Sequence, residues 1–117
     1  MSETINILLD SQMGISRLGG NKTLYLKLLT SFFESLKEGL PPFKNVLSNQ
    51  SREEFCREIH SLKGVSGNLS AIALYESCTA LDASLKLGNL EEDLYNNIVV
   101  VFKKTQIEVE RFLKENL

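Results

Sequence analysis

Apolar side chains recur along most of this chain at intervals of three and four residues, which places them on one face of an α-helix. The clearest case is the segment with Leu74, Cys78, Leu81 and Leu85 in register. The one short β-branched run, residues 98–101, lies inside another such segment. Because the helical periodicity there continues for about five turns, it outweighs the local preference for strand. The sequence therefore predicts an all-α fold.

Capping residues and glycines predict where the first helices begin and end. Asp10 is expected to cap a short helix that reaches about Leu18 and stops at Gly19 and Gly20. Asn21 then caps a long helix. The expected apolar stripe of this helix is Leu24, Leu28, Phe32 and Leu36.

Two consecutive prolines, Pro41 and Pro42, predict a break near Gly39, since neither has an amide hydrogen to donate. We expect the helix to resume afterwards through Phe43, Val46 and Leu47.

The next helix is predicted from a capping box, Ser51 with Glu54, and should end between residues 68 and 71, where asparagine and serine favour a turn. Gly88 can end the following helix, and Asn89 with Glu92 forms a second cap-like pair that should start the last one. The expected inward stripe of the last helix is Leu94, Ile98, Val101, Thr105, Val109 and Phe112.

Four long amphipathic helices with short connections predict an antiparallel up-and-down four-helix bundle, with the short N-terminal helix capping one end as a lid. At 117 residues, 43% of them hydrophobic, the chain fits one domain with a core of its own. The net charge is −2 and no basic stripe stands out, so nucleic acid is not an expected partner.

No apolar run approaches the ~20 residues that span a bilayer, and no secretory signal opens the chain, so we expect no direct membrane contact and a cytoplasmic location. Cys56 and Cys78 are expected to be free thiols in a reducing compartment. One histidine and two separated cysteines match no common zinc spacing, so no metal site is predicted.

The single histidine, His60, shares one helical face with Lys63, Gly64 and Gly67, with Cys56 alongside. The opposite face should be buried, and it collects Phe55, Ile59, Leu62, Ser66 and Leu69. Glycine in a helix interior costs about 1 kcal/mol relative to alanine. Two glycines beside an exposed imidazole clear space for a large partner, and a nearby lysine supplies positive charge. This combination suits a nucleophile that accepts a phosphoryl group from another macromolecule.

The run from His60 resembles the signature of histidine-containing phosphotransfer (HPt) domains of bacterial multistep phosphorelays, roughly His-x-Leu-Lys-Gly-x-x-x-x-Leu-Gly-Ala. The matching positions are His60, Leu62, Lys63, Gly64, Leu69 and Ala71. Ser70 stands where glycine is usual, and we expect this departure to alter the helix end more than the chemistry. The resemblance extends upstream through residues 18–29 and implies a single HPt-like domain over residues 1–117.

The resemblance implies a phosphoryl carrier. His60 would accept the group from the aspartyl phosphate of a response-regulator receiver domain and pass it to another receiver. The receiver would bring Mg²⁺ and most of the groups that in-line transfer needs, so no intrinsic cofactor is expected. The chain would act as a monomer without kinase activity of its own. It could be free-standing or part of a hybrid sensor kinase, and the sequence leaves both open.

Among the site residues, Lys63 is expected to stabilise phosphoryl charge, with solvation of the helix face as the alternative. Gly64 and Gly67 are expected to give access, and close helix–helix packing is the weaker alternative because both share the histidine face. The resemblance places Asp82 where some members orient the histidine through Nδ1, although aspartate is short and ordinary solvation is an equal alternative. Arg57 could attract an acidic partner, with solvation again the alternative.

Two other classes of function remain to be compared with the carrier. A helical adaptor that binds signalling partners without phosphorylation would not need His60. An autonomous enzyme is disfavoured, because the chain has no glycine-rich loop for ATP, no paired acidic metal site and no second histidine.

Overall fold

The computed structural model describes residues 7–117, and every regular element in that range is a helix. The four long helices are α2 (Lys22–Leu36), α3 (Asn49–Asn68), α4 (Ile72–Lys86) and α5 (Glu92–Asn116). A short helix, α1 (Ser11–Arg17), precedes them, and a single 3-10 turn, η2 (Phe43–Val46), lies between α2 and α3. The predicted all-α class is confirmed, including for residues 98–101, which are helical.

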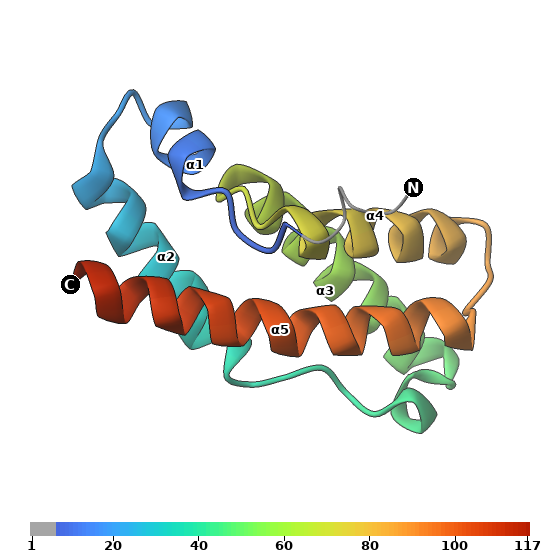
Figure 1. Cartoon of the computed structure of the whole chain (residues 1–117). Helices are drawn as coiled ribbons and strands as arrows, with labels where there is room; N and C mark the ends of the chain where they lie inside the picture. Colours follow the sequence, from blue (N-terminus) through green and yellow to red (C-terminus); the bar gives the residue numbers. More distant parts are fainter. Residues whose placement is uncertain (1–6) are drawn as a thin grey trace.

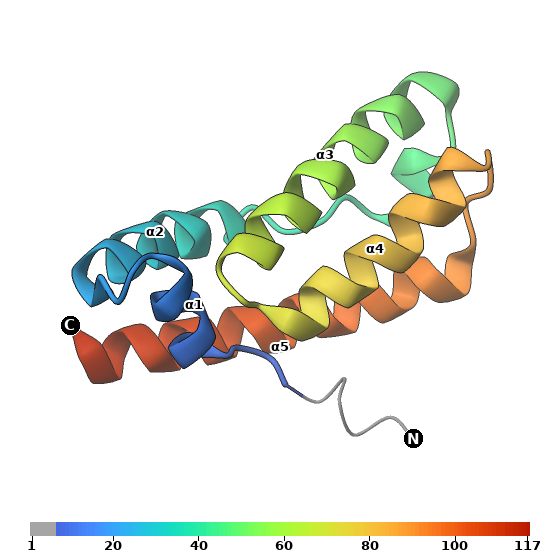
Figure 2. The ribbon, with the colours of Figure 1, turned by 90° about the horizontal axis from the view of Figure 1, so that it is seen from above.

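The long helices form an antiparallel bundle built around α5 (Figure 1). α2 packs along the C-terminal half of α5 and α4 along its N-terminal half, while α3 packs on α4. α1 lies at the end of the bundle where α2 begins and α3 turns into α4 (Figure 2). The predicted bundle with a short helix over one end is therefore confirmed.

Hydrogen bonds between distant segments hold α1 and α2 against the turn that follows α3. The Asp10 amide donates to the Ser70 carbonyl at 2.9 Å. The Tyr25 hydroxyl, which is buried, donates to the Leu69 carbonyl at 2.8 Å. Burial, with a smaller contribution from the Asp10 charge, raises the pKa of Tyr25 to about 12, so the hydroxyl keeps its proton and remains a donor.

Two of the predicted caps are confirmed and two are wrong. The Asp10 and Asn21 side chains cap α1 and α2 as expected. α3 begins at Asn49, before the predicted box, because the Ser48 side chain accepts from the amide of Ser51. The Asn89 amide donates to the carbonyl of Ser84, so this residue closes α4 and does not cap α5. The predicted ends near residues 68–71 and at Gly88 are confirmed.

The buried face of α2 differs from the predicted stripe. Leu24 and Leu28 are 38% and 40% exposed, whereas Tyr25 and Leu29 are fully buried. Steps of four residues overshoot a helical turn of 3.6, so a stripe built only from such steps drifts off the face. In α5 the predicted Ile98, Thr105 and Val109 are fully buried. The other three predicted members, Leu94, Val101 and Phe112, are half-buried, and the residues that follow them, Tyr95, Phe102 and Leu113, are the buried ones.

The proline break is confirmed, but the helix that follows is shorter than predicted. α2 ends at Leu36, and Gly39 adopts a φ of 73° in the loop. Only the single turn of η2 follows the prolines, and it buries Val46 while Leu47 stays 51% exposed. The predicted core face of α4 is confirmed, and so is that of α3 except for Leu62, which is half-buried. None of the helices in residues 7–117 has the length and apolar character required to cross a membrane.

Candidate functional site

His60 lies on the solvent-facing side of α3, and 64% of its side chain is exposed. The preceding residue, Ile59, is fully buried against the neighbouring helices and fixes the rotation of α3 about its axis. The predicted division of this helix into a buried face and a histidine face is therefore what the structure shows. The imidazole is thus exposed on a helix whose opposite face belongs to the core.

Asp82 of α4 lies beside the imidazole. Its side chain is 5% exposed, and its Oδ2 atom is 3.6 Å from Nδ1 of His60. This distance is longer than a hydrogen bond but within ion-pair range. The contact is made at Nδ1, the ring nitrogen that the predicted role of Asp82 involves. The structure thus brings Asp82 beside the imidazole but not within hydrogen-bond distance of Nδ1, and its role in orienting the ring stays a prediction.

Two lysines contact the same carboxylate oxygen. The Nζ atoms of Lys63 and Lys86 lie 3.0 Å and 3.1 Å from Asp82 Oδ2. Burial raises the pKa of Asp82, but hydrogen bonds from the two lysines and their positive charges outweigh it, so the net shift is below the usual range. The carboxylate is therefore ionised at neutral pH. Lys63 is the predicted residue. Lys86 was not predicted, although its i, i+4 spacing from Asp82 was a visible signal.

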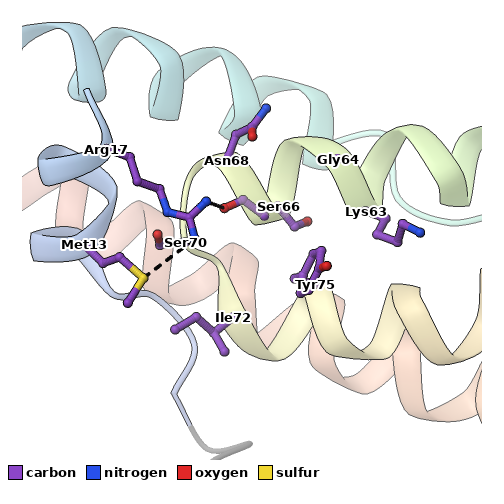
Figure 3. A pocket seen from close by; sticks show the side chains of 10 residues that line it. Met13, Arg17, Lys63, Gly64, Ser66, Asn68, Ser70, Ile72 and Tyr75 are labelled. Atoms are coloured by element: carbon purple, nitrogen blue, oxygen red, sulfur yellow. Dashed lines mark hydrogen bonds between the residues drawn. The ribbon is translucent and has the colours of Figure 1, made fainter. Parts of the chain in front are cut away.

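The two glycines of the motif have different surroundings. Apart from its two chain neighbours and the nearby backbone of α3, no described atom lies within 4 Å of a Cβ built on Gly64, so the surface beside Lys63 is open. A Cβ on Gly67 would lie only 3.0 Å and 3.1 Å from two ring carbons of Tyr75. Figure 3 shows this ring on α4 facing α3. Gly67 therefore lets α4 approach α3 closely, as the packing alternative expects, and the access role of the two glycines stays a prediction.

An open hollow of about 460 Å³ surrounds the histidine. It lies between the exposed sides of α3 and α4, and its lining residues are Cys56, Arg57, His60, Ser61, Asp82, Leu85 and Lys86. Arg57 is exposed at its rim, which adds positive charge to an opening that already holds two lysines near it. The hollow is electrostatically suited to an anionic group.

Comparison with protein families gives one finding. The family model of the Hpt domain matches residues 27–104, which is more than half of the chain and includes the histidine and its neighbours from both helices. The chain belongs to the Hpt domain family. Hpt domains are helical bundles that carry phosphoryl groups on histidine in phosphorelays. No curated protein and no solved structure matches this Hpt domain.

Both thiols of the Hpt domain are free. Cys78 is fully buried, and burial followed by the nearby Asp82 charge raises its pKa to about 12, so it stays protonated and inert. Cys56 is half-buried on the same side of α3 as the histidine. Within residues 7–117 no three side chains of the His, Cys, Asp or Glu types gather to hold a metal ion.

A second hollow, of about 410 Å³, lies between α1 and the turn that joins α3 to α4 in this Hpt domain (Figure 3). The Arg17 guanidinium crosses it and donates to the Gly67 carbonyl at 3.3 Å. Ser66 and Ser70 also line it, and their hydroxyls are buried without a hydrogen-bond partner in the described structure. The Arg17 contact ties α1 to the end of α3, and Lys63 and Gly64 line the same hollow.

Proposed function

We propose that this Hpt domain carries a phosphoryl group on Nε2 of His60. It would receive the group from the aspartyl phosphate of one receiver domain and pass it to the aspartate of another. The observation that supports this most directly is an exposed imidazole whose Nδ1 faces the buried, ionised carboxylate of Asp82. Membership of a family of phosphoryl carriers agrees with it.

In the proposed transfer, the Nε2 lone pair attacks phosphorus while the bond between phosphorus and the aspartyl oxygen breaks. The receiver carboxylate leaves with the electron pair of that bond. Nδ1 keeps its proton, so the ring becomes a phosphorylated imidazolium. The Asp82 carboxylate, 3.6 Å from Nδ1, would stabilise that new positive charge through its own negative charge. Transfer to the second receiver is the same step in reverse.

Lys63 and Gly64 assist in different ways. The Lys63 ammonium, 25% exposed and one turn along from His60, would stabilise charge on the phosphoryl oxygens. Gly64 leaves the adjacent surface bare, so a receiver can bring its aspartyl phosphate in line with the histidine. The receiver would supply Mg²⁺ for the transferring group. We expect the domain to act as a monomer, in the cytoplasm, and as a carrier without kinase activity.

The test is transfer of labelled phosphoryl from a phosphorylated receiver to the wild-type protein and to His60→Gln. We expect acid-labile label on the wild type alone, because phosphohistidine is lost in acid whereas phosphoserine is retained. The thermal midpoint of His60→Gln should stay close to that of the wild type, since the ring is 64% exposed.

Two results would contradict the proposal. Normal acid-labile labelling of His60→Gln would show that the phosphoryl acceptor lies elsewhere. A helical adaptor would give a different pattern: the wild type would bind receivers but take no label, and His60→Gln would bind them with the same affinity.

A further inference from the structure

One oxygen atom, Oδ2 of Asp82, is contacted by three groups that can carry positive charge. They are Nδ1 of His60 at 3.6 Å, Nζ of Lys63 at 3.0 Å and Nζ of Lys86 at 3.1 Å. With a neutral imidazole, two ammonium groups therefore face one carboxylate. The resting cluster has an excess positive charge beside the proposed nucleophile.

Lys86 differs from Lys63 in its freedom to move. Its side chain is 63% exposed at the end of α4, and it lines the same hollow as His60. The Lys63 side chain is only 25% exposed and is held between the helices. Because the Lys86 ammonium and the imidazole contact the same oxygen, a short rotation of an exposed, flexible stem brings the ammonium to the open side of the ring.

We propose that Lys86 is a second phosphoryl-binding cation, which Asp82 holds beside His60 until the phosphoryl group arrives. This inference rests on the proposed function of His60. After transfer, the phosphoryl group brings about two negative charges, and the imidazolium replaces the ammonium of Lys86 as a partner of Asp82. Two ammonium groups and the imidazolium then balance the carboxylate and the phosphoryl group, so the cluster is neutral only in the phosphorylated state.

A purely structural role for Lys86 makes a different prediction. If the lysine only neutralised Asp82, its removal would alter folding stability and leave the phosphoryl group unaffected. A cation that binds the phosphoryl group instead lowers the pKa of that group and slows its hydrolysis. The titration of the phosphoryl group therefore separates the two roles.

The experiment phosphorylates the protein with phosphoramidate, a small donor that needs no receiver, and follows the ³¹P NMR signal of the phosphohistidine. Lys86→Gln is compared with Lys86→Arg and with Lys114→Gln. Lys114 is a matched control, since it also pairs with a carboxylate four residues earlier on its helix, Glu110, at 3.6 Å. Thermal midpoints of all variants are measured alongside.

We expect Lys86→Gln to shorten the phosphohistidine lifetime about threefold, an effect in the range of an exposed charge pair. The pH midpoint of the phosphoryl signal should rise, and both changes should shrink in high salt. Lys86→Arg should keep the wild-type lifetime and pH midpoint, and Lys114→Gln should match the wild type in both.

Two outcomes overturn the inference while leaving the proposed function intact. In the first, the wild type is labelled on His60 and Lys86→Gln has the same lifetime and midpoint as Lys114→Gln. In the second, Lys86→Gln shortens the phosphohistidine lifetime and Lys86→Arg shortens it as much. A wild type that gains no acid-labile phosphate from phosphoramidate or from a receiver would contradict the proposed function itself.

Discussion

Ser70 adopts a backbone conformation that side chains other than glycine rarely take, with a φ of 59°. The residue is 3% exposed, and its hydroxyl has no hydrogen-bond partner within the described residues. Ser70→Gly removes both costs, against a smaller entropic loss from the more flexible unfolded chain. We expect the free energy of unfolding to rise by about 1 kcal/mol, as measured by urea denaturation.

Ser70→Ala separates the two contributions to this effect. Alanine removes the unpaired hydroxyl but keeps the Cβ that the positive φ disfavours, so it should give less stabilisation than glycine. Phosphoryl transfer should be unchanged in both variants, because Ser70 lies beyond the end of α3 and does not line the histidine hollow. A Ser70→Gly protein no more stable than the wild type would show that the backbone strain is not significant.

Gly64 and Gly67 allow the same substitution to be compared at two places on one helix. Gly64→Ala should raise the free energy of unfolding by up to about 1 kcal/mol, because the added methyl meets open space and alanine favours helix. Gly67→Ala should stabilise less, since Tyr75 must move to accommodate the methyl. Thermal unfolding of both variants tests this, and equal gains would contradict the packing role of Gly67.

Access to the histidine is tested by a larger residue at the open position. Gly64→Gln should fold like the wild type but accept phosphoryl from a receiver more slowly, because its side chain occupies the surface that the receiver approaches. Labelling by phosphoramidate, a much smaller donor, should change little. If Gly64→Gln accepts phosphoryl from the receiver at the wild-type rate, the open surface is not needed for docking.

Local sequence was sufficient to find the chemically distinctive residues of the site but not all of their partners. His60, Lys63 and Gly64 stand close together on one helix, so their shared face follows from helical spacing alone. The packing of Gly67 against Tyr75 depends on how closely α4 approaches α3, and no spacing within α3 reveals that distance. Lys86 could have been predicted from the sequence, because it pairs with Asp82 four residues earlier on the same helix.

At the scale of elements, α2 shows how a correct helix can be predicted with the wrong face inward. Leu28 is 40% exposed and its neighbour Leu29 is fully buried. Leu29→Ala should therefore lower the free energy of unfolding by about 3 kcal/mol, whereas Leu28→Ala should cost less than about 1 kcal/mol. Urea denaturation of the two variants measures the difference. Comparable losses would show that α2 does not turn the face with Leu29 toward the core.

Helix boundaries were predicted less well than helix positions, for a local reason. Several residues near each end of a helix have side chains that can cap it, and the sequence offers both Ser48 and Ser51 for α3. The structure uses Ser48, which leaves Ser51 inside the first turn. The amide of Asn89 donates to the Ser84 carbonyl at the end of α4, so Asn89 belongs to the end of α4 and does not cap α5.

At the scale of the whole molecule, the site exists because two helices are held in one relative position. His60 belongs to α3 and Asp82 to α4, and their contact is a property of the bundle. The burial of Asp82 at 5% exposure means that its ion pairs also connect the two helices. Stability and the electrostatics of the proposed nucleophile therefore depend on the same carboxylate.

This dependence predicts how stability changes with pH. The folded protein lowers the pKa of Asp82, so the ionised carboxylate favours folding at any pH above its unfolded value, near 3.9. That contribution is lost as pH falls through the lower folded value, because the unfolded chain takes up the proton first. Asp82→Asn should cost about 1 kcal/mol at pH 7, and the difference from the wild type should shrink below about pH 4.

Urea denaturation of the two proteins between pH 7 and pH 3 measures this difference. Glu110→Gln is the control, because it removes an exposed carboxylate that also pairs with a lysine four residues away, and it should have little effect at any pH. A gap between wild type and Asp82→Asn that stays constant or widens at low pH would mean that the ionised carboxylate does not stabilise the fold. The proposed effect of Asp82 on the phosphohistidine would then be separate from stability, and the phosphohistidine lifetime of Asp82→Asn would test it.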